Sequence, residues 1–144
     1  MNVPRLDRDV VTRRLRQLRD TLDELAPMRA VTPARLAAAP LERAGVERLL
    51  QVAVDLAIDI NAHLAVAELG RAPATGRESF HAVGEAGVID RELAERLAPA
   101  AGLRNVLVHR YVDISLELVA QSVGEVLDGF GAYVEQVADF VARG

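Results

Sequence analysis

The stretch Leu41–Leu69, LERAGVERLLQVAVDLAIDINAHLAVAEL, is the longest periodic segment of the sequence and decides the fold class. Its apolar residues recur at the spacing that places side chains on one face of an α-helix. Gly70 follows, and glycine is common just past the end of a helix. We therefore expect one long helix, with an inward stripe of Leu49, Val52, Leu56, Ile60, His63 and Ala67. On that stripe His63 would be buried and hydrogen-bonded.

Two further long helices are expected, one toward each end of the chain. Asp7–Leu25 has an apolar stripe of Val11, Leu15, Leu18, Leu22 and Leu25. Its other faces carry Arg13, Arg14, Arg16 and Arg19, which form either a solvated face with Asp20 and Asp23 or an RNA contact. Ser115 predicts the start of a last helix that reaches about Ala142. The inner side of that helix would carry Val119, Val123, Val126, Leu127, Phe130, Val134, Val137 and Val141.

Shorter elements are expected between these three helices. In chain order they are a turn of helix at Pro33–Ala38, a loop at Arg71–Ser79, a helix at Phe80–Ala86 closed by Gly87, a helix from Arg91 capped by Asp90 and disturbed at Pro99 and Gly102, and its continuation from Leu103 to about Arg110. No useful length of sequence alternates with period two, so no sheet is expected. The prediction is an all-α protein, one domain over residues 1–144, folded as an up-and-down bundle of four or five helices.

The composition limits both the core and the function. Aromatic residues make up only 3% of the chain, so the core is expected to rest on aliphatic ridges rather than aromatic clusters. The chain has no cysteine, which excludes disulfides and thiolate metal sites. All seventeen basic residues are arginine, and the net charge of −4 argues against non-specific coating of nucleic acid. A local basic cleft that acts on RNA remains compatible with this charge.

The sequence also predicts the compartment. The N-terminus is rich in arginine and aspartate where a signal peptide needs an apolar stretch. No segment approaches the roughly 18 uninterrupted apolar residues that a membrane span requires. We therefore expect a cytoplasmic protein with no membrane partner.

The candidate site is the run Arg104–Tyr111, RNVLVHRY, which sets polar groups inside an apolar segment. A permanent cation beside an imidazole that titrates near neutral pH suits the handling of phosphates. On a straight helix Arg104 and His109 lie about 140° apart, whereas Arg104 and Tyr111 lie about 20° apart. A site that uses both Arg104 and His109 therefore needs a break, near Gly102 or over Val112–Ser115, or a second subunit.

The spacing Arg-x4-His-x-Tyr, with asparagine directly after the arginine, resembles the signature of the HepT-like toxins of the HEPN superfamily. Three further segments follow that family's order: Glu47–Leu64 (ERLLQVAVDLAIDINAHL), Gly87–Asp90 (GVID) and Leu103–Ile114 (LRNVLVHRYVDI). The resemblance covers residues 41–144 as a HEPN-like core. The N-terminal helix and connector, residues 1–40, match only in being helical.

The resemblance implies the toxin of a type VII-like toxin–antitoxin pair, a metal-independent endoribonuclease that uses no cofactor. It implies cleavage by attack of a ribose 2′-hydroxyl, with Arg104, Asn105 and His109 as catalytic residues. The implied partner is a minimal nucleotidyltransferase antitoxin that neutralises the toxin by AMPylation of Tyr111. The implied substrate is transfer or messenger RNA, and the implied assembly is a homodimer.

Other interpretations of the same residues stay open. Arg104 could form a structural ion pair with Asp55 or Asp59, and these carboxylates either face solvent or support the cleft by positioning Arg104 or His109. Asp59 and His63 have the i, i+4 spacing of metal ligands, but no further histidines cluster with them and no metal site is expected. At the level of function, the alternatives are a non-catalytic helical module that docks a nucleotidyltransferase, and a dimeric bundle with structural duties only.

Overall fold

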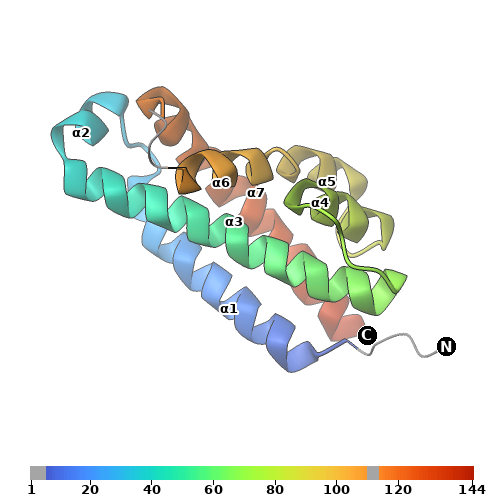
Figure 1. The fold of residues 1–144 in the computed structure, drawn as a ribbon. Helices are drawn as coiled ribbons and strands as arrows, with labels where there is room; N and C mark the ends of the chain where they lie inside the picture. The colour runs from blue at the N-terminus through green and yellow to red at the C-terminus, as the bar shows by residue number, and fades with distance from the viewer. Residues whose placement is uncertain (1–5, 110–113) are drawn as a thin grey trace.

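The structure, a computed structural model, describes residues 6–109 and 114–144 (Figure 1). In chain order its elements are α1 (Arg8–Leu25), a 3-10 turn (Ala26–Met28), α2 (Pro33–Ala38), α3 (Pro40–Leu69), α4 (Gly76–Glu85), α5 (Arg91–Leu97), α6 (Ala100–Val108) and α7 (Leu116–Arg143). The described residues contain no β-strand. The predicted all-α class is confirmed.

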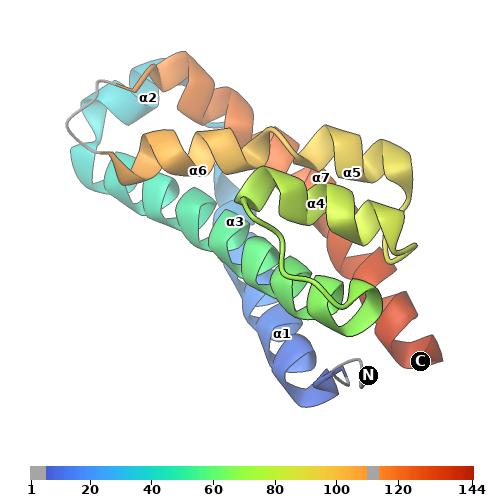
Figure 2. The same ribbon diagram turned by 45° about the vertical axis from the view of Figure 1, so that its right-hand side comes forward.

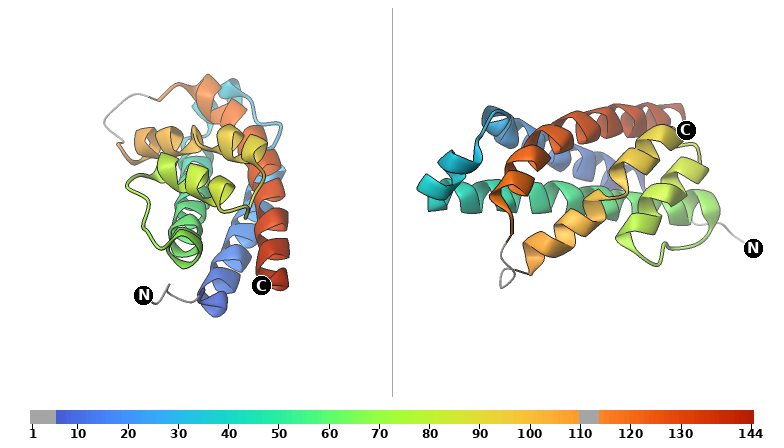
Figure 3. Two further views of the ribbon diagram at one scale, coloured as in Figure 1. Left: turned by 90° about the vertical axis from the view of Figure 1, so that its right-hand side faces the viewer. Right: turned by 90° about the horizontal axis from the view of Figure 1, so that it is seen from above.

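The long helices alternate in direction, which confirms the up-and-down bundle. α1 runs one way, α3 returns, α5 and α6 together form an interrupted third leg, and α7 returns again (Figures 1 and 2). Figure 3 shows α1 and α7 side by side, with α3 between α1 and the layer of α4 and α6. The start of α1 and the end of α7 therefore lie at the same end of the bundle.

Side-chain caps explain where the helices begin. Asp7, Asp90 and Ser115 each accept a hydrogen bond from the backbone N–H three residues later, at 3.1, 2.7 and 3.3 Å. α4 starts at Gly76 rather than Phe80, because Thr75 accepts from the Glu78 N–H at 3.1 Å and caps the helix earlier. The predicted loop over residues 71–79 is correspondingly shorter.

Gly70 and Gly87 close α3 and the α4 turn, as predicted, with positive φ angles of 73° and 76°. Glycine adopts this left-handed conformation without the steric cost that a Cβ brings.

The two outer long helices bury the stripes predicted for them, whereas α3 does not. All the apolar positions named for α1 and α7 are buried. Of the stripe predicted for α3, only Ile60 is buried; the buried face is Val46, Leu50, Ala53, Val54, Ala57, Ile60, Asn61, Leu64 and Ala65. His63 lies outside it, with 43% of its side chain exposed, so its predicted burial is wrong. α3 packs against α1, α4, α6 and α7, and a helix covered on several sides gives no single stripe to read.

The core contains an aromatic cluster, contrary to the prediction of purely aliphatic packing. Phe80, Phe130 and Tyr133 are fully buried, and their ring centroids lie 5.9 to 6.3 Å apart in tilted and edge-on arrangements. Few aromatic residues are present, but three of them meet where α4 and α7 approach each other.

A buried polar chain runs from this cluster to the start of α4. The Tyr133 hydroxyl donates to Asn61 Oδ1 at 2.6 Å, and Asn61 Nδ2 donates to Ser79 Oγ at 3.1 Å. The Ser79 hydroxyl donates to the Gly76 carbonyl at 2.5 Å. Burial raises the pKa of the Tyr133 phenol well above its usual value. The chain ties α7, α3 and α4 together.

By length and composition α3 could cross a membrane, a test that core helices of globular proteins also pass. Of its most apolar window, 44% is buried inside the protein. The packing of α3 against four other helices accounts for its apolar character.

Candidate functional site

α6 carries the first half of the Arg104–Tyr111 motif and ends at Val108. His109 is the residue that ends the helix: its N–H still bonds to the Asn105 carbonyl at 3.3 Å, but its ψ of 76° is not helical. The helix was expected to run from Leu103 to about Arg110. A break therefore falls at His109, inside the motif, whereas Gly102 lies within α6. Tyr111, the expected modification site, lies outside the described residues.

Arg104 is held by a carboxylate from the middle of α3. Its Nε donates to Asp55 Oδ1 at 2.6 Å, and its Nη1 lies 3.5 Å from Asn105 Oδ1. The two paired side chains are 36% and 39% exposed, so the ion pair contributes at most about 1 kcal/mol to stability. Its main effect is geometric, because a bonded Nε fixes the plane of the guanidinium and leaves the terminal nitrogens for another acceptor.

Arg104 and Asn105 line a pocket of about 370 Å³ where α3, α6 and the start of α4 meet. Its lining residues are Asp55, Ile58, Thr75, Gly76, Arg77, Ala101, Gly102, Arg104 and Asn105. The motif pair and Asp55 are thus brought together, along with Arg77, which the sequence reading did not single out. A pocket with two guanidiniums and one amide suits a phosphate group.

His109 is exposed and does not line this pocket. Because its backbone N–H keeps the helical bond to Asn105, its side chain starts from a different side of α6 than that of Arg104. The separation expected from helical geometry therefore persists within one chain.

Asp59, the second predicted supporting carboxylate, does not line the Arg104 pocket. It accepts from Arg14 Nε of α1 at 2.9 Å and lies 3.9 Å from His63 Nε2. The charged outer face of α1 thus reaches α3 through Arg14. Among residues 6–109 and 114–144, no group of three or more histidine, aspartate or glutamate side chains could hold a metal ion.

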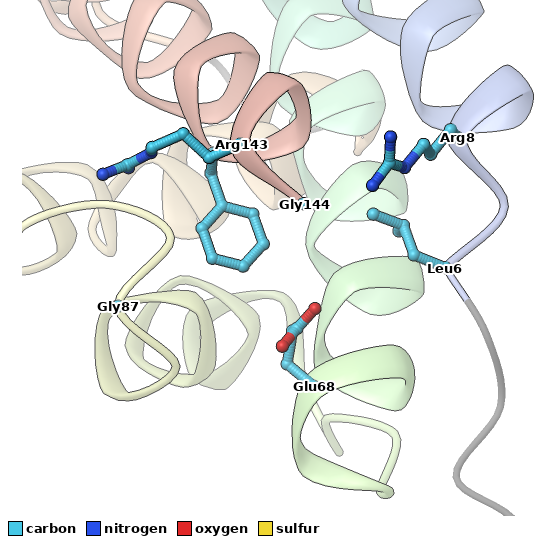
Figure 4. Close-up of a pocket in the computed structure, with 7 residues that line it drawn as sticks. Leu6, Arg8, Glu68, Gly87, Arg143 and Gly144 are labelled. Atoms are coloured by element: carbon cyan, nitrogen blue, oxygen red, sulfur yellow. The ribbon is translucent and has the colours of Figure 1, made fainter.

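Pockets of greater volume also lie away from Arg104, among them two that differ in character. One, about 790 Å³, is at the far end of α3, about 20 Å from Asp55 at 1.5 Å per helical residue. Figure 4 shows Arg8 and Glu68 approaching it from opposite sides, while Arg143 extends away from both. The other, about 680 Å³, is an apolar groove between α5–α6 and the first half of α7, with Val106 and Leu118 exposed beside it.

Comparison with known proteins identifies the family. The family model described as ribonuclease HepT-like matches residues 12–137, which includes most of α1. A tRNA nuclease HepT of Aphanizomenon flos-aquae is 37% identical over 95 residues, covering 66% of this chain and 65% of the relative. An mRNA nuclease HepT of Shewanella oneidensis is 28% identical over 88 residues, covering 61% and 66%. The matched regions span about two thirds of these two relatives.

Solved structures share the fold. The tri-AMPylated HEPN toxin of Shewanella oneidensis, in complex with MNT antitoxin, superposes with a TM-score of 0.80 at 21% identity, covering 96% of this chain and 99% of that one. A toxin–antitoxin crystal structure with AMP-PNP gives a TM-score of 0.79 at 20% identity, covering 91% and 98%. At these identities the likeness to the solved structures establishes the fold. The family model matches residues 12–137, most of the sequence, and this chain therefore belongs to the ribonuclease HepT-like family.

Proposed function

We propose that this protein is the toxin of a toxin–antitoxin pair and acts as an endoribonuclease that needs no metal. The observation that carries the proposal is Arg104, held at 2.6 Å by Asp55 in a pocket that it shares with Asn105. The helix that presents both residues ends at Val108, and His109 follows directly. In a ribonuclease HepT-like chain, this arrangement supplies a fixed cation, an amide and an imidazole within six residues of sequence.

The proposed chemistry divides the reaction among three side chains. His109 removes the proton from a ribose 2′-hydroxyl, or protonates the leaving 5′-oxygen, a role that typically gives 10²–10⁴-fold acceleration. Arg104 stabilises the charge that develops on the phosphoryl oxygens through its terminal nitrogens. Asn105 orients the phosphate or His109. The products are a 2′,3′-cyclic phosphate and a 5′-hydroxyl.

The proposed assembly is a homodimer, because one chain presents Arg104 and His109 from different sides of α6. A second copy would bring the His109 of one chain toward the Arg104 of the other. The apolar groove beside α6, with Val106 and Leu118 exposed, offers a surface for such pairing.

The proposed antitoxin is a minimal nucleotidyltransferase that transfers AMP to Tyr111. The added phosphate would repel the RNA backbone and block the cleft. The solved tri-AMPylated toxin in complex with MNT antitoxin supports this partner. We propose RNA as the substrate, in the cytoplasm; one relative is named for transfer RNA and another for messenger RNA.

The test is RNA cleavage in the presence of EDTA. Wild type should cleave and leave cyclic-phosphate ends, whereas His109→Ala and Arg104→Ala should lose activity by at least a hundredfold. His81→Ala is the matched control, because His81 is an exposed histidine of α4 outside the pocket. Its cleavage should equal that of wild type.

The competing function is a non-catalytic module that docks a nucleotidyltransferase. The observation in its favour is that the Arg104–Asp55 pair is already complete, as a structural ion pair would be. It predicts that neither the wild type nor any variant cleaves RNA, and that the purified protein still binds its nucleotidyltransferase. Cleavage that disappears on addition of EDTA would instead contradict the metal-independent mechanism.

A further inference from the structure

We propose that Arg77 is a second phosphate-binding residue of the Arg104 pocket and supplies its attraction for RNA. This inference deepens the proposed function and rests on it. Arg77 lies far from the motif in sequence, on the first turn of α4, yet it lines the same pocket as Arg104 and Asn105.

The charged residues that line the pocket are Asp55, Arg77 and Arg104. Arg104 is paired with Asp55, so together they are formally neutral. Arg77 is exposed and forms no ion pair with any residue of the described ranges. The neighbouring Glu78 carboxylate is turned to the Ala74 N–H, 3.3 Å away, and does not line the pocket. Arg77 is therefore what makes the pocket net positive in a chain of net charge −4.

The start of α4 packs closely against α3 and α6. A Cβ on Gly76 would lie 2.8 Å from Ile58 Cδ1 of α3 and 3.3 Å from the Ala101 Cβ of α6. The absence of a side chain at this position lets the start of α4 approach both helices that build the site. Arg77 follows directly, so its backbone is held beside the helices that carry Asp55 and Arg104.

The buried polar chain fixes the same turn from the other side. Ser79 bonds the Gly76 carbonyl and is itself bonded by Asn61, with both side chains buried. Buried, fully satisfied networks of this kind hold backbone segments in one arrangement. Arg77 thus combines a fixed backbone with an exposed guanidinium, which suits capture of a flexible strand.

The division of work follows from this geometry. Arg104, oriented by Asp55, faces the reacting phosphate, and Arg77 binds a neighbouring phosphate of the same strand. The loss of Arg77 should then weaken RNA binding and raise KM while leaving kcat largely intact. Lysine at this position would keep the charge without the bidentate fork.

Binding should be measured separately from cleavage, by fluorescence anisotropy of a short single-stranded RNA over a range of salt concentrations. The proteins are His109→Ala and the same variant carrying Arg77→Ala, Arg77→Lys or Arg91→Ala. Arg91 is the matched control, an exposed arginine at the start of α5 outside the pocket. Thermal unfolding of each variant verifies that it is folded.

Arg77→Ala should weaken binding about tenfold and reduce the slope of log affinity against log salt by about 0.7, the value for one phosphate contact on a single strand. Arg77→Lys should recover the slope and part of the affinity, and Arg91→Ala should change neither. Equal behaviour of Arg77→Ala and Arg91→Ala would overturn the inference. If the wild type cleaves no RNA, the proposed function fails; the binding result then still decides whether Arg77 holds phosphate.

Discussion

The buried phenol of Tyr133 predicts a loss of stability at alkaline pH. Tyr133 is fully buried and donates to Asn61, and burial raises the pKa of its hydroxyl well above the usual value. In the unfolded chain the same hydroxyl ionises near pH 10. A group whose pKa is raised on folding stabilises the folded state fully at pH values below its unfolded pKa. This stabilisation is lost as the pH rises from the unfolded pKa through the folded pKa. Stability should therefore fall from about pH 10 upward.

The magnitude follows from linkage. Each pH unit between the unfolded and the folded pKa lowers the free energy of unfolding by about 1.4 kcal/mol, so about 2 kcal/mol is lost about 1.5 units above the unfolded pKa while the folded phenol stays protonated. This is a measurable part of the 5–15 kcal/mol typical of small domains. The chain is well suited to the measurement because it has no lysine and no cysteine, and Tyr111 is its only other tyrosine.

The assay is urea unfolding, followed by circular dichroism, at several values between about pH 9 and pH 11.5. Tyr133→Phe should cost about 1–3 kcal/mol at the lower pH, because Asn61 Oδ1 loses its donor. Its stability should then stay nearly constant as the pH rises. Tyr111→Phe measures how much of the slope the other phenol contributes. Parallel curves for wild type and Tyr133→Phe would refute the reasoning, since another group would then be responsible.

Three further predictions concern single positions. Gly76→Ala should lower the free energy of unfolding by about 1–3 kcal/mol and weaken RNA binding, because the new methyl would lie 2.8 Å from a side chain of α3. Gly45→Ala should raise the free energy of unfolding by about 0.5–1 kcal/mol, because Gly45 is a helical position with open space around it. Gly70→Ala should lower it by about 1–2 kcal/mol, because Gly70 has a φ of 73°. Urea unfolding of both variants distinguishes the two signs. Asp55→Asn should reduce kcat for RNA at least tenfold by releasing Arg104, with less than about 1 kcal/mol lost in stability. Unchanged kcat in Asp55→Asn would mark the pair as structural.

The sequence predicted the helices whose burial is one-sided. α1 and α7 present one face to the core and the other to solvent, so their buried positions follow from periodicity alone. α3 contacts α1, α4, α6 and α7, and its buried residues are not confined to one narrow stripe. For α3 the sequence pattern therefore predicts the helix and its ends but not which of its faces is buried. The error placed His63 inside, and Asn61, the buried polar residue of this helix, was missed.

The site was predictable only in part, for a related reason. Arg104, Asn105 and the candidate partner Asp55 came from the motif and from helix spacing, and the structure brings them to one pocket. Arg77 lay in a segment assigned to a loop. The signal was present, because Thr75 and Glu78 have the spacing of a capping box, which marks a helix start just before Arg77. Nothing local, however, indicates that this start packs between α3 and α6.

The arrangement of charges explains why such a site would use two arginines. An arginine paired with a carboxylate is well oriented but formally neutral, so it contributes direction more than attraction. An unpaired arginine attracts a phosphate but adopts many rotamers, so it contributes attraction more than direction. A site that must both collect a polyanion and align one phosphate gains by separating the two tasks. In this chain Asp55 orients Arg104, and the fixed start of α4 supplies Arg77. The two variants should therefore have different kinetic effects: Asp55→Asn should lower kcat, and Arg77→Ala should raise KM.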